Sequence, residues 1–116
     1  MAVVTINVGQ CGNQLGFDVL NSLFDNLKGD IGDIDVFFRS SLSERQIART
    51  VCLDTEPKVV LNSIQKSQKK EWAYDANHCV FRHGGAGNNW AMGYQMCSGE
   101  FLEKSIDSIR FVEISF

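Results

Sequence analysis

The chain has 116 residues, a length that corresponds to one domain at most. Apolar residues make up 44% of it and aromatic residues 10%, which is typical of a globular protein and excludes a disordered segment. The formal net charge of -3 disfavours nucleic acid as a partner, because nucleic-acid-binding domains are usually basic and neutralise many backbone phosphates. No apolar run is long enough to cross a bilayer, and nothing resembles a signal peptide. We therefore expect neither a nucleic-acid partner nor membrane insertion.

The N-terminal part predicts a strand, a tight turn and a long amphipathic helix. Residues 2–8 are rich in β-branched side chains and alternate loosely, which favours a strand. The apolar residues that then recur at helical spacing are Leu15, Val19, Leu20, Leu23, Phe24 and Leu27. Gly29 is expected at the C-cap of this helix. Residues 29–48 have weak periodicity, so we expect a loop with at most one short element.

Two further strands follow, each with a helix after it. Residues 49–54 predict a buried strand, and Pro57 stands where the first turn of a helix is expected. Residues 79–82 predict a short strand, and the strongest turn signal of the chain follows at 83–89. Apolar residues recur at helical spacing over 102–109. This order predicts an α/β fold in which a parallel sheet is flanked by helices.

Cysteine and histidine give little sign of a metal site. The four cysteines are at positions 11, 52, 79 and 97, and no two of them form a C-x-x-C pair. Without a secretory signal we expect free, buried thiols. The spacing of His78, Cys79 and His83 resembles a ligand set, but zinc needs four converging ligands and no second cluster supplies the rest. We expect Cys79 to be a small core residue on a strand, and both histidines to be surface or loop residues.

Three predicted strands end in polar or glycine-rich loops, at 9–12, 54–56 and 84–89. In open α/β sheets, ligands bind outside the carboxyl ends of the strands. Because parallel strands share one carboxyl edge, these three loops are expected to lie together. Each loop is ambiguous by itself, but their combination favours a nucleotide site.

The first of these loops leads directly into a helix. The N-terminus of a helix has unpaired N–H groups and partial positive charge, which suit a phosphate. Glycines at 9, 12 and 16 permit a tight turn and close packing of helix on strand. The spacing is neither G-x-G-x-x-G nor that of a Walker A loop, so plain turn chemistry remains the alternative.

The other two loops suit a cation and phosphate oxygens. Asp54 and Glu56 can share a Mg²⁺ ion with a phosphate. The alternative is helix capping, with Asp54 or Thr55 at the N-cap and Glu56 in the first turn. The third loop ends in two asparagines, whose amides can donate to phosphate oxygens. Trp90 follows, and we expect it to anchor packing rather than to stack on a base.

Three segments together resemble the tubulin family. They are GQCGNQLG at 9–16, LDTEP at 53–57 and GAGNNWAMGY at 85–94, in the family's order and at roughly its separations. The resemblance covers about residues 1–110, as part of the family's nucleotide-binding domain, and residues 111–116 form a divergent tail. Within the family the chain is most similar to the delta branch, notably in GFDV in the first predicted helix.

The resemblance implies a GTP-binding α/β domain of a cytoskeletal protein. The residues that match the family's nucleotide-binding positions are Gln10, Cys11, Gln14, Ala86, Gly87 and Asn88. Glu56 matches the acid near the family's Mg²⁺ ion, and Asp54 lies beside it. The implied partners are other tubulins, microtubules and centriolar proteins. The implied location is the cytoplasm and cytoskeleton, with the centrosome or centriole, and the cilium or nucleus.

The resemblance also implies what this sequence lacks. The family's phosphate-wrapping signature G-G-G-T-G-S-G is absent, as are the residues that hold guanine and the acid that activates water. The chain looks like a truncated N-terminal part of the domain. We expect no catalytic residue in it, and very weak GTP binding or none. The alternative is a non-catalytic interaction module that associates with tubulins or their chaperones through an open sheet edge.

Overall fold

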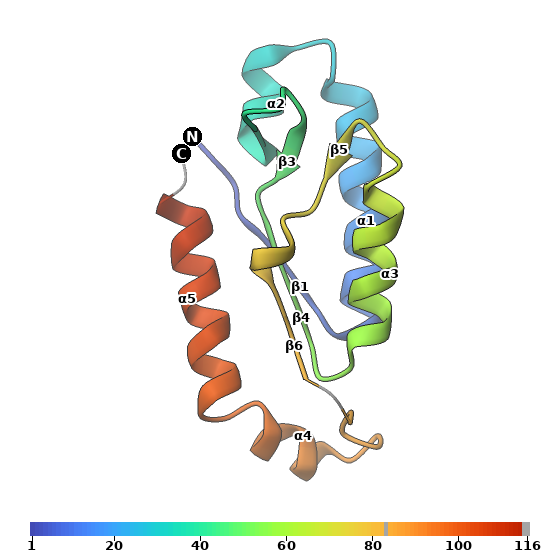
Figure 1. Ribbon diagram of the computed structural model, residues 1–116, viewed down its shortest axis with the longest axis vertical. Helices are drawn as coiled ribbons and strands as arrows, with labels where there is room; N and C mark the ends of the chain where they lie inside the picture. The colour runs from blue at the N-terminus through green and yellow to red at the C-terminus, as the bar shows by residue number, and fades with distance from the viewer. Residues whose placement is uncertain (83, 115–116) are drawn as a thin grey trace.

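A parallel sheet of three strands lies at the centre of the fold (Figure 1). The computed structural model describes residues 1–82 and 84–114. The strands are β1 (Thr5–Val8), β4 (Thr50–Asp54) and β6 (Cys79–Phe81), in the order β1-β4-β6. Thr5 lies opposite Thr50, and Leu53 lies opposite Val80. The three predicted strands and their parallel arrangement are confirmed, although β1 begins later than expected.

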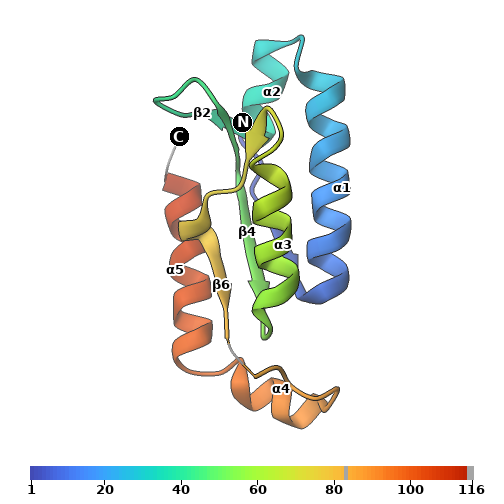
Figure 2. The same cartoon turned by 45° about the vertical axis from the view of Figure 1, so that its right-hand side comes forward.

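Helices cover both faces of this sheet. Helix α1 (Gly9–Leu27) and α3 (Pro57–Ser67) pack together on one face, and α5 (Glu100–Ile114) covers β4 and β6 on the other (Figure 1). The short helix α4 (Trp90–Met96) lies beyond the carboxyl ends of the strands (Figure 2). The α/β fold predicted from the sequence is therefore confirmed. No helix among the described residues is long and apolar enough to cross a membrane.

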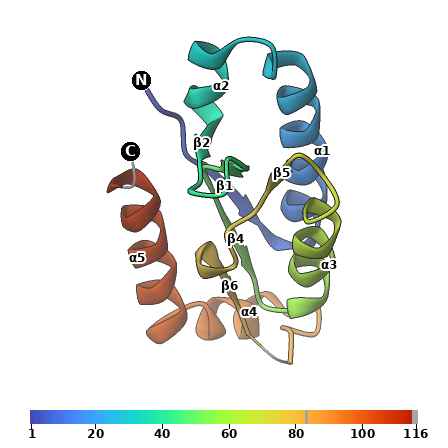
Figure 3. The same cartoon turned by 45° about the horizontal axis from the view of Figure 1, so that its top comes forward.

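A second, smaller sheet corrects the expectation of a loop over residues 29–48. Helix α2 (Ile31–Phe37) leads into β2 (Phe38–Ser40), and β3 (Gln46–Ala48) and β5 (Trp72–Ala73) complete the order β2-β3-β5 (Figure 3). Strands of two or three residues are too short to show a period. The start of α2 did carry a signal, because the Asp30 side chain accepts hydrogen bonds from the N–H groups of Gly32 and Asp33.

The small sheet completes an aromatic core against α1. Trp72 and Phe38 are fully buried, and their ring centroids lie 5.8 Å apart. The Trp72 indole N–H donates to the Asn21 side chain on α1 at 3.2 Å. Leu20 and Phe24 are buried as predicted, whereas Leu15 and Val19 are exposed. The buried stripe of α1 is thus narrower than its apolar pattern indicates, because nothing among the described residues packs on its other flank.

Several single-residue expectations are corrected. Helix α1 ends at Leu27, and its C-cap is Lys28 rather than Gly29, with the Lys28 N–H donating to the Phe24 carbonyl oxygen. His78 is buried, with 2% of its surface exposed, because the Phe111 ring of α5 packs on it. His83 lies outside the described residues.

The cysteines differ from one another in burial. Cys52 is buried, Cys79 and Cys97 are half-buried, and Cys11 is exposed, so the expectation of four buried thiols holds fully for Cys52 alone. Cys79 does lie on a strand, β6, as expected.

Candidate functional site

A cavity of about 480 Å³ lies at the carboxyl ends of the three parallel strands. Its wall consists of Gln10, Asp54, Thr55, Glu56, Val59 and residues 86–90. All three predicted strand-end loops contribute to it, so the expectation that they share one edge is confirmed. Gln10 comes from the start of α1, the acidic residues follow β4, and the last segment precedes α4.

The structure separates the predicted site residues into two groups. Those that line the cavity are Gln10, Asp54, Glu56, Ala86, Gly87 and Asn88. Cys11 and Gln14 do not line it; both are exposed on the first turns of α1. The nucleotide-binding role of each residue stays a prediction.

The start of α1 is left open for a ligand. Its N-cap, Val8, offers no side-chain hydrogen bond, and its first turn carries no acidic residue. The backbone N–H groups there therefore keep the partial positive charge that favours an anion. Gly16 lets α1 approach β1 closely, because a Cβ at this position would overlap the Asn7 side chain. The close helix-on-strand packing predicted from the glycines is confirmed there.

Asn13 fixes the first turn of α1 to the end of β4. Its Nδ2 donates to the Gly9 carbonyl oxygen at 2.8 Å and to the Leu53 carbonyl oxygen at 3.0 Å. The residue is fully buried. It therefore holds the first two loops of the cavity in register. This role was not predicted from the sequence, where the available signal was an asparagine one turn into a helix that follows a strand.

The loop after β4 uses Asp54 to shape itself. The Asp54 side chain accepts a hydrogen bond from the Glu56 N–H at 3.1 Å, as in an Asx turn. The N-cap of α3 is Glu56, which makes no capping side-chain bond, and Pro57 is the first helical residue as predicted. The expectation of Asp54 or Thr55 at the N-cap is wrong by one or two residues. The Glu56 carboxylate is consequently not used for capping the helix.

Gly85 brings the third loop onto the second. It is buried, its φ is +58°, and a Cβ there would overlap the Glu56 carboxylate. Its N–H donates to the Thr55 carbonyl oxygen at 3.3 Å. Gly87 and Asn88 also have positive φ, at +59° and +57°. Gly85 was absent from the predicted site, although the Gly-Gly pair in this loop pointed to such a position.

Helix α4 begins at the edge of the cavity. The Asn89 side chain accepts a hydrogen bond from the Met92 N–H at 3.1 Å and so caps the helix. Trp90 is 80% exposed and stacks on Tyr94, with ring centroids 5.3 Å apart. The expectation that Trp90 anchors packing in a core is wrong, because no other element covers α4 from that side among the described residues.

The charges around the cavity suit a phosphate only together with a cation. Asp54 and Glu56 are its two carboxylates, and none of the described lining residues is basic. Mg²⁺ bound with a phosphate typically takes one or two carboxylates, with water and phosphate oxygens completing its shell. No group of three or more His, Cys, Asp and Glu suited to a metal occurs within 1–82 and 84–114. The pair of carboxylates suits a Mg²⁺ ion that also binds phosphate oxygens, so the lining residues fit the phosphate and Mg²⁺ end of a nucleotide.

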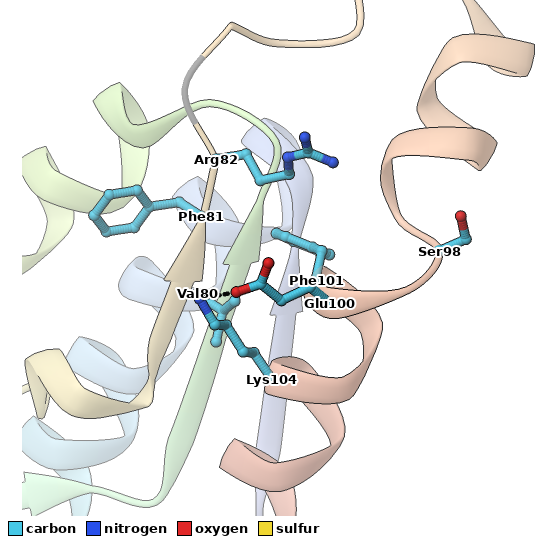
Figure 4. A pocket seen from close by; sticks show the side chains of 7 residues that line it. All are labelled: Val80, Phe81, Arg82, Ser98, Glu100, Phe101 and Lys104. Carbon is cyan, nitrogen blue, oxygen red and sulfur yellow. Dashed lines mark ion pairs between the residues drawn. The ribbon is translucent and has the colours of Figure 1, made fainter.

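A second cavity, of about 390 Å³, lies between β6 and α5 (Figure 4). Its basic side chains are already engaged. The Lys104 Nζ is 2.9 Å from a Glu100 carboxylate oxygen, and an Arg82 guanidinium nitrogen donates to the Met96 carbonyl oxygen at 2.7 Å. The start of α5 lies at this cavity, but its first turn already carries Glu100 and Glu103. The described lining of the cavity also lacks a glycine-rich loop, which makes it the weaker candidate.

Comparison with known proteins gives one consistent answer. A family model described as the GTPase domain of the Tubulin/FtsZ family matches residues 2–112. The chain is 35% identical over 124 residues to the tubulin delta chain of Macaca fascicularis, covering 95% of this chain and 27% of that one. It is 36% identical over 128 residues to the tubulin delta chain of Canis lupus familiaris, covering 98% and 28%.

A more distant relative has another name. The chain is 32% identical over 120 residues to the nucleomorph tubulin beta chain of Guillardia theta, which covers 93% of this chain and 27% of the relative. These matches confirm the tubulin resemblance and its delta character. The chain spans little more than a quarter of the length of the relatives it matches.

Proposed function

Because the chain belongs to the Tubulin/FtsZ family, we propose that its cavity is the phosphate side of a GTP site. Gln10 would approach the phosphates from α1, and Ala86, Gly87 and Asn88 from the loop before α4. Asp54 and Glu56 would hold Mg²⁺, which when bound offsets the negative charge of the phosphates. Cys11 and Gln14 stay part of this proposal on the resemblance alone.

One observation carries the proposal, namely the convergence of three loops on a single cavity at the carboxyl edge of the sheet. Asn13 ties the first loop to the second, and Gly85 ties the second to the third. Such ties preorganise backbone N–H groups before a ligand arrives, which reduces the ordering cost of binding. A set of unrelated turns would not need these cross-links between loops.

We propose that this chain by itself binds GTP only weakly and does not hydrolyse it. Most residues of the cavity wall are exposed, including Gln10, Asn88 and Trp90. A tight small-molecule site encloses most of its ligand, whereas this cavity is largely open to solvent. The contacts available are too few to offset the cost of ligand ordering.

Titration of the isotope-labelled chain with Mg-GTP, followed by NMR, tests the site. We expect the amides of Gln10 and residues 86–88 to shift, with half-saturation at millimolar nucleotide. Inorganic triphosphate with Mg²⁺ should shift the same amides, and guanosine should not, because the proposed site contacts the phosphates and not the nucleoside. Amides near Lys66 serve as an internal control, since they lie at the far end of α3. Unchanged amides at Gln10 and 86–88 would contradict the site, and micromolar affinity by calorimetry would contradict the weak binding.

A second function, association with other proteins, rests on the free edge of β1. This strand lies at one end of the sheet order β1-β4-β6, so no strand of the described residues pairs with its outer edge. Ile6 and Val8 are exposed there, and an apolar cavity of about 280 Å³ adjoins them, lined by Val8, Leu53 and Phe101 among others. Open edges with apolar flanks accept added strands. We propose tubulins or their chaperones as the partners.

Binding to purified full-length tubulin tests this second function. Ile6→Lys places a charge on the edge strand and should abolish binding. Leu61→Lys is the matched control, because Leu61 is 47% exposed and Ile6 is 46% exposed, but Leu61 lies on α3. Equal binding of both variants to tubulin, or no binding of the unaltered chain, contradicts the proposal.

The partners and location follow from the same family membership. We propose other tubulins and microtubules as partners, which the tubulin names of the relatives support. We propose centriolar proteins as further partners on the family resemblance alone. The location proposed is the cytoskeleton, at the centriole or centrosome and in the cilium or nucleus. Imaging of the endogenous protein with an antibody against residues 1–60 tests this, and a signal that never coincides with centrioles would contradict it.

A further inference from the structure

Two cysteines lie directly opposite each other on neighbouring strands of the central sheet. Cys52 on β4 is the register partner of Cys79 on β6. Neighbouring strands lie about 4.8 Å apart, and disulfides join Cα atoms about 4.4–6.8 Å apart. Register partners point to the same face of a sheet, so the two side chains face one layer of the fold. The backbone already holds this pair within disulfide reach.

The pair belongs to a row of polar groups under α1. Asn7 on β1 is the register partner of Cys52, and its Nδ2 lies 3.9 Å from the Cys52 sulfur and 3.5 Å from the Tyr74 hydroxyl oxygen. The Cys79 thiol is directed toward the Asp75 carbonyl oxygen, 3.6 Å away. The two thiols are thus set in a buried polar row rather than scattered in an apolar core.

The two thiols differ in access. Cys52 is 1% exposed, whereas Cys79 is half-buried and can be reached from solvent. Contact with the Cys79 side chain is the main cause that raises the pKa of the Cys52 thiol, and burial raises it further. Cys52 therefore stays a thiol and is shielded from direct attack on a peroxide in solution. Only the neighbouring sulfur of Cys79 is placed to engage it.

We propose that Cys52 and Cys79 form a reversible disulfide when the protein meets a peroxide. The Cys79 thiolate attacks one oxygen of hydrogen peroxide, the O–O bond breaks, and Cys79 sulfenic acid and hydroxide result. The Cys52 sulfur then attacks the sulfenic sulfur. A sulfur–sulfur bond forms, and the sulfenic oxygen leaves as water with the Cys52 proton. The pair of thiols loses two electrons, which the peroxide gains.

The proposed bond joins strands that are already paired, so it constrains rather than rearranges the sheet. The strand spacing lies inside the range that disulfides span, and Cys79 is partly accessible, so a thiol reductant can reach the bond. This makes the pair suited to reversible oxidation rather than to permanent stabilisation. The proposal does not depend on nucleotide binding, because neither cysteine lines the cavity at the strand ends.

Peptide mapping of the full chain tests the proposal. The native protein is treated with hydrogen peroxide, the remaining thiols are alkylated, and trypsin is added. Cys52 then lies on peptide 50–58 and Cys79 on peptide 71–82, because Arg49, Lys58, Lys70 and Arg82 bound them. We expect these peptides joined, with a mass two hydrogens below their sum, and separated again by a thiol reductant. Separate alkylation of both cysteines, or links to Cys11 or Cys97 instead, would overturn the proposal.

Two controls keep the result interpretable. Cys97→Ser, at another half-buried cysteine, should leave the link intact, whereas Cys79→Ser should remove it. If Cys79→Ser fails to fold, the native chain oxidised in denaturant replaces it. In denaturant, the yield of the Cys52–Cys79 disulfide relative to other disulfides should fall by about tenfold or more, because the strands no longer hold the two thiols together. An equal preference in native and denatured protein would show that the sheet does not direct the bond.

Discussion

The Glu56 carboxylate occupies the space that a Cβ would fill at Gly85. This contact joins the loop after β4 to the loop before α4, and the hydrogen bond from the Gly85 N–H to the Thr55 oxygen reinforces it at 3.3 Å. The acidic residue proposed to hold Mg²⁺ is therefore positioned by a glycine of another loop. The cavity is one structure rather than three independent turns.

Gly85→Ala is expected to destabilise the protein more than Gly87→Ala. Both glycines have φ close to +60°, so each alanine costs about 1–2 kcal/mol of backbone strain. A Cβ at Gly87 meets nothing within 4 Å, whereas at Gly85 it displaces Glu56. Urea denaturation of both variants measures the difference. Combining Gly85→Ala with Glu56→Ala should restore the Gly87→Ala level, and a double variant as unstable as Gly85→Ala alone would contradict this account.

Asn13→Ala should cost about 1–3 kcal/mol of unfolding free energy, because two partly buried backbone oxygens each lose the hydrogen bond from Asn13. Asn26→Ala is the matched control. Asn26 lies on the same helix and donates to the Ser22 oxygen at 2.9 Å, but it is exposed, so its replacement should cost much less. Thermal denaturation checks both. Equal losses for the two variants would mean that Asn13 does not fasten α1 to β4.

Stability should fall as the solution is acidified through the titration of His78. Burial lowers the pKa of His78 below its ordinary value of 6.5; Asp75, 3.8 Å from Nδ1, opposes this, and Arg39 adds to it. The unfolded chain therefore binds a proton that the folded chain rejects, and folding stability present above pH 6.5 is lost as the pH falls below it.

Urea denaturation at several pH values measures this loss. His78→Gln removes the titrating group. The stability of this variant should therefore change less than that of the parent between about pH 7 and pH 5, the range in which histidine titrates. His83 is present in both proteins and cancels in the comparison. A parent and variant with the same pH dependence would exclude His78 as the source.

Glu56→Gln should weaken the Mg²⁺-dependent part of nucleotide binding by about 1 kcal/mol, since one of two carboxylates near the cation is lost. With the cation removed by a chelator, the same variant should bind no more weakly than the parent, because a negative charge near the phosphates has gone. Glu103→Gln on α5 is the control. NMR titration checks these values, and an equal loss with and without Mg²⁺ would contradict a metal-holding role.

The parallel sheet and its three loops were predictable because their signals are local. A β-branched run at residues 2–8 and a helical period after it are visible in any short window, and Pro57 marks a helix start. Parallel strands then bring their carboxyl ends to one edge, so the loops that hold Gln10, Glu56 and Asn88 were expected together, and the structure has all three residues around one cavity.

The remainder depended on which side chains meet from distant parts of the chain. The short strands β2 and β5 exist because Phe38 and Trp72 bury each other against α1, and no short window contains both residues. His78, which was expected to be a surface or loop residue, is buried because Phe111 of α5 packs on it.

The sequence by itself determined the family, the order of the elements and the edge at which a ligand would bind, because turns, caps and periodicity act over a few neighbouring residues. Tertiary structure alone decided which groups share a contact: Gly85 beneath Glu56, Asn13 against Leu53, and Cys52 beside Cys79. Each of these pairs is separated by about 27 to 40 positions, so only strand register and helix packing bring its members together.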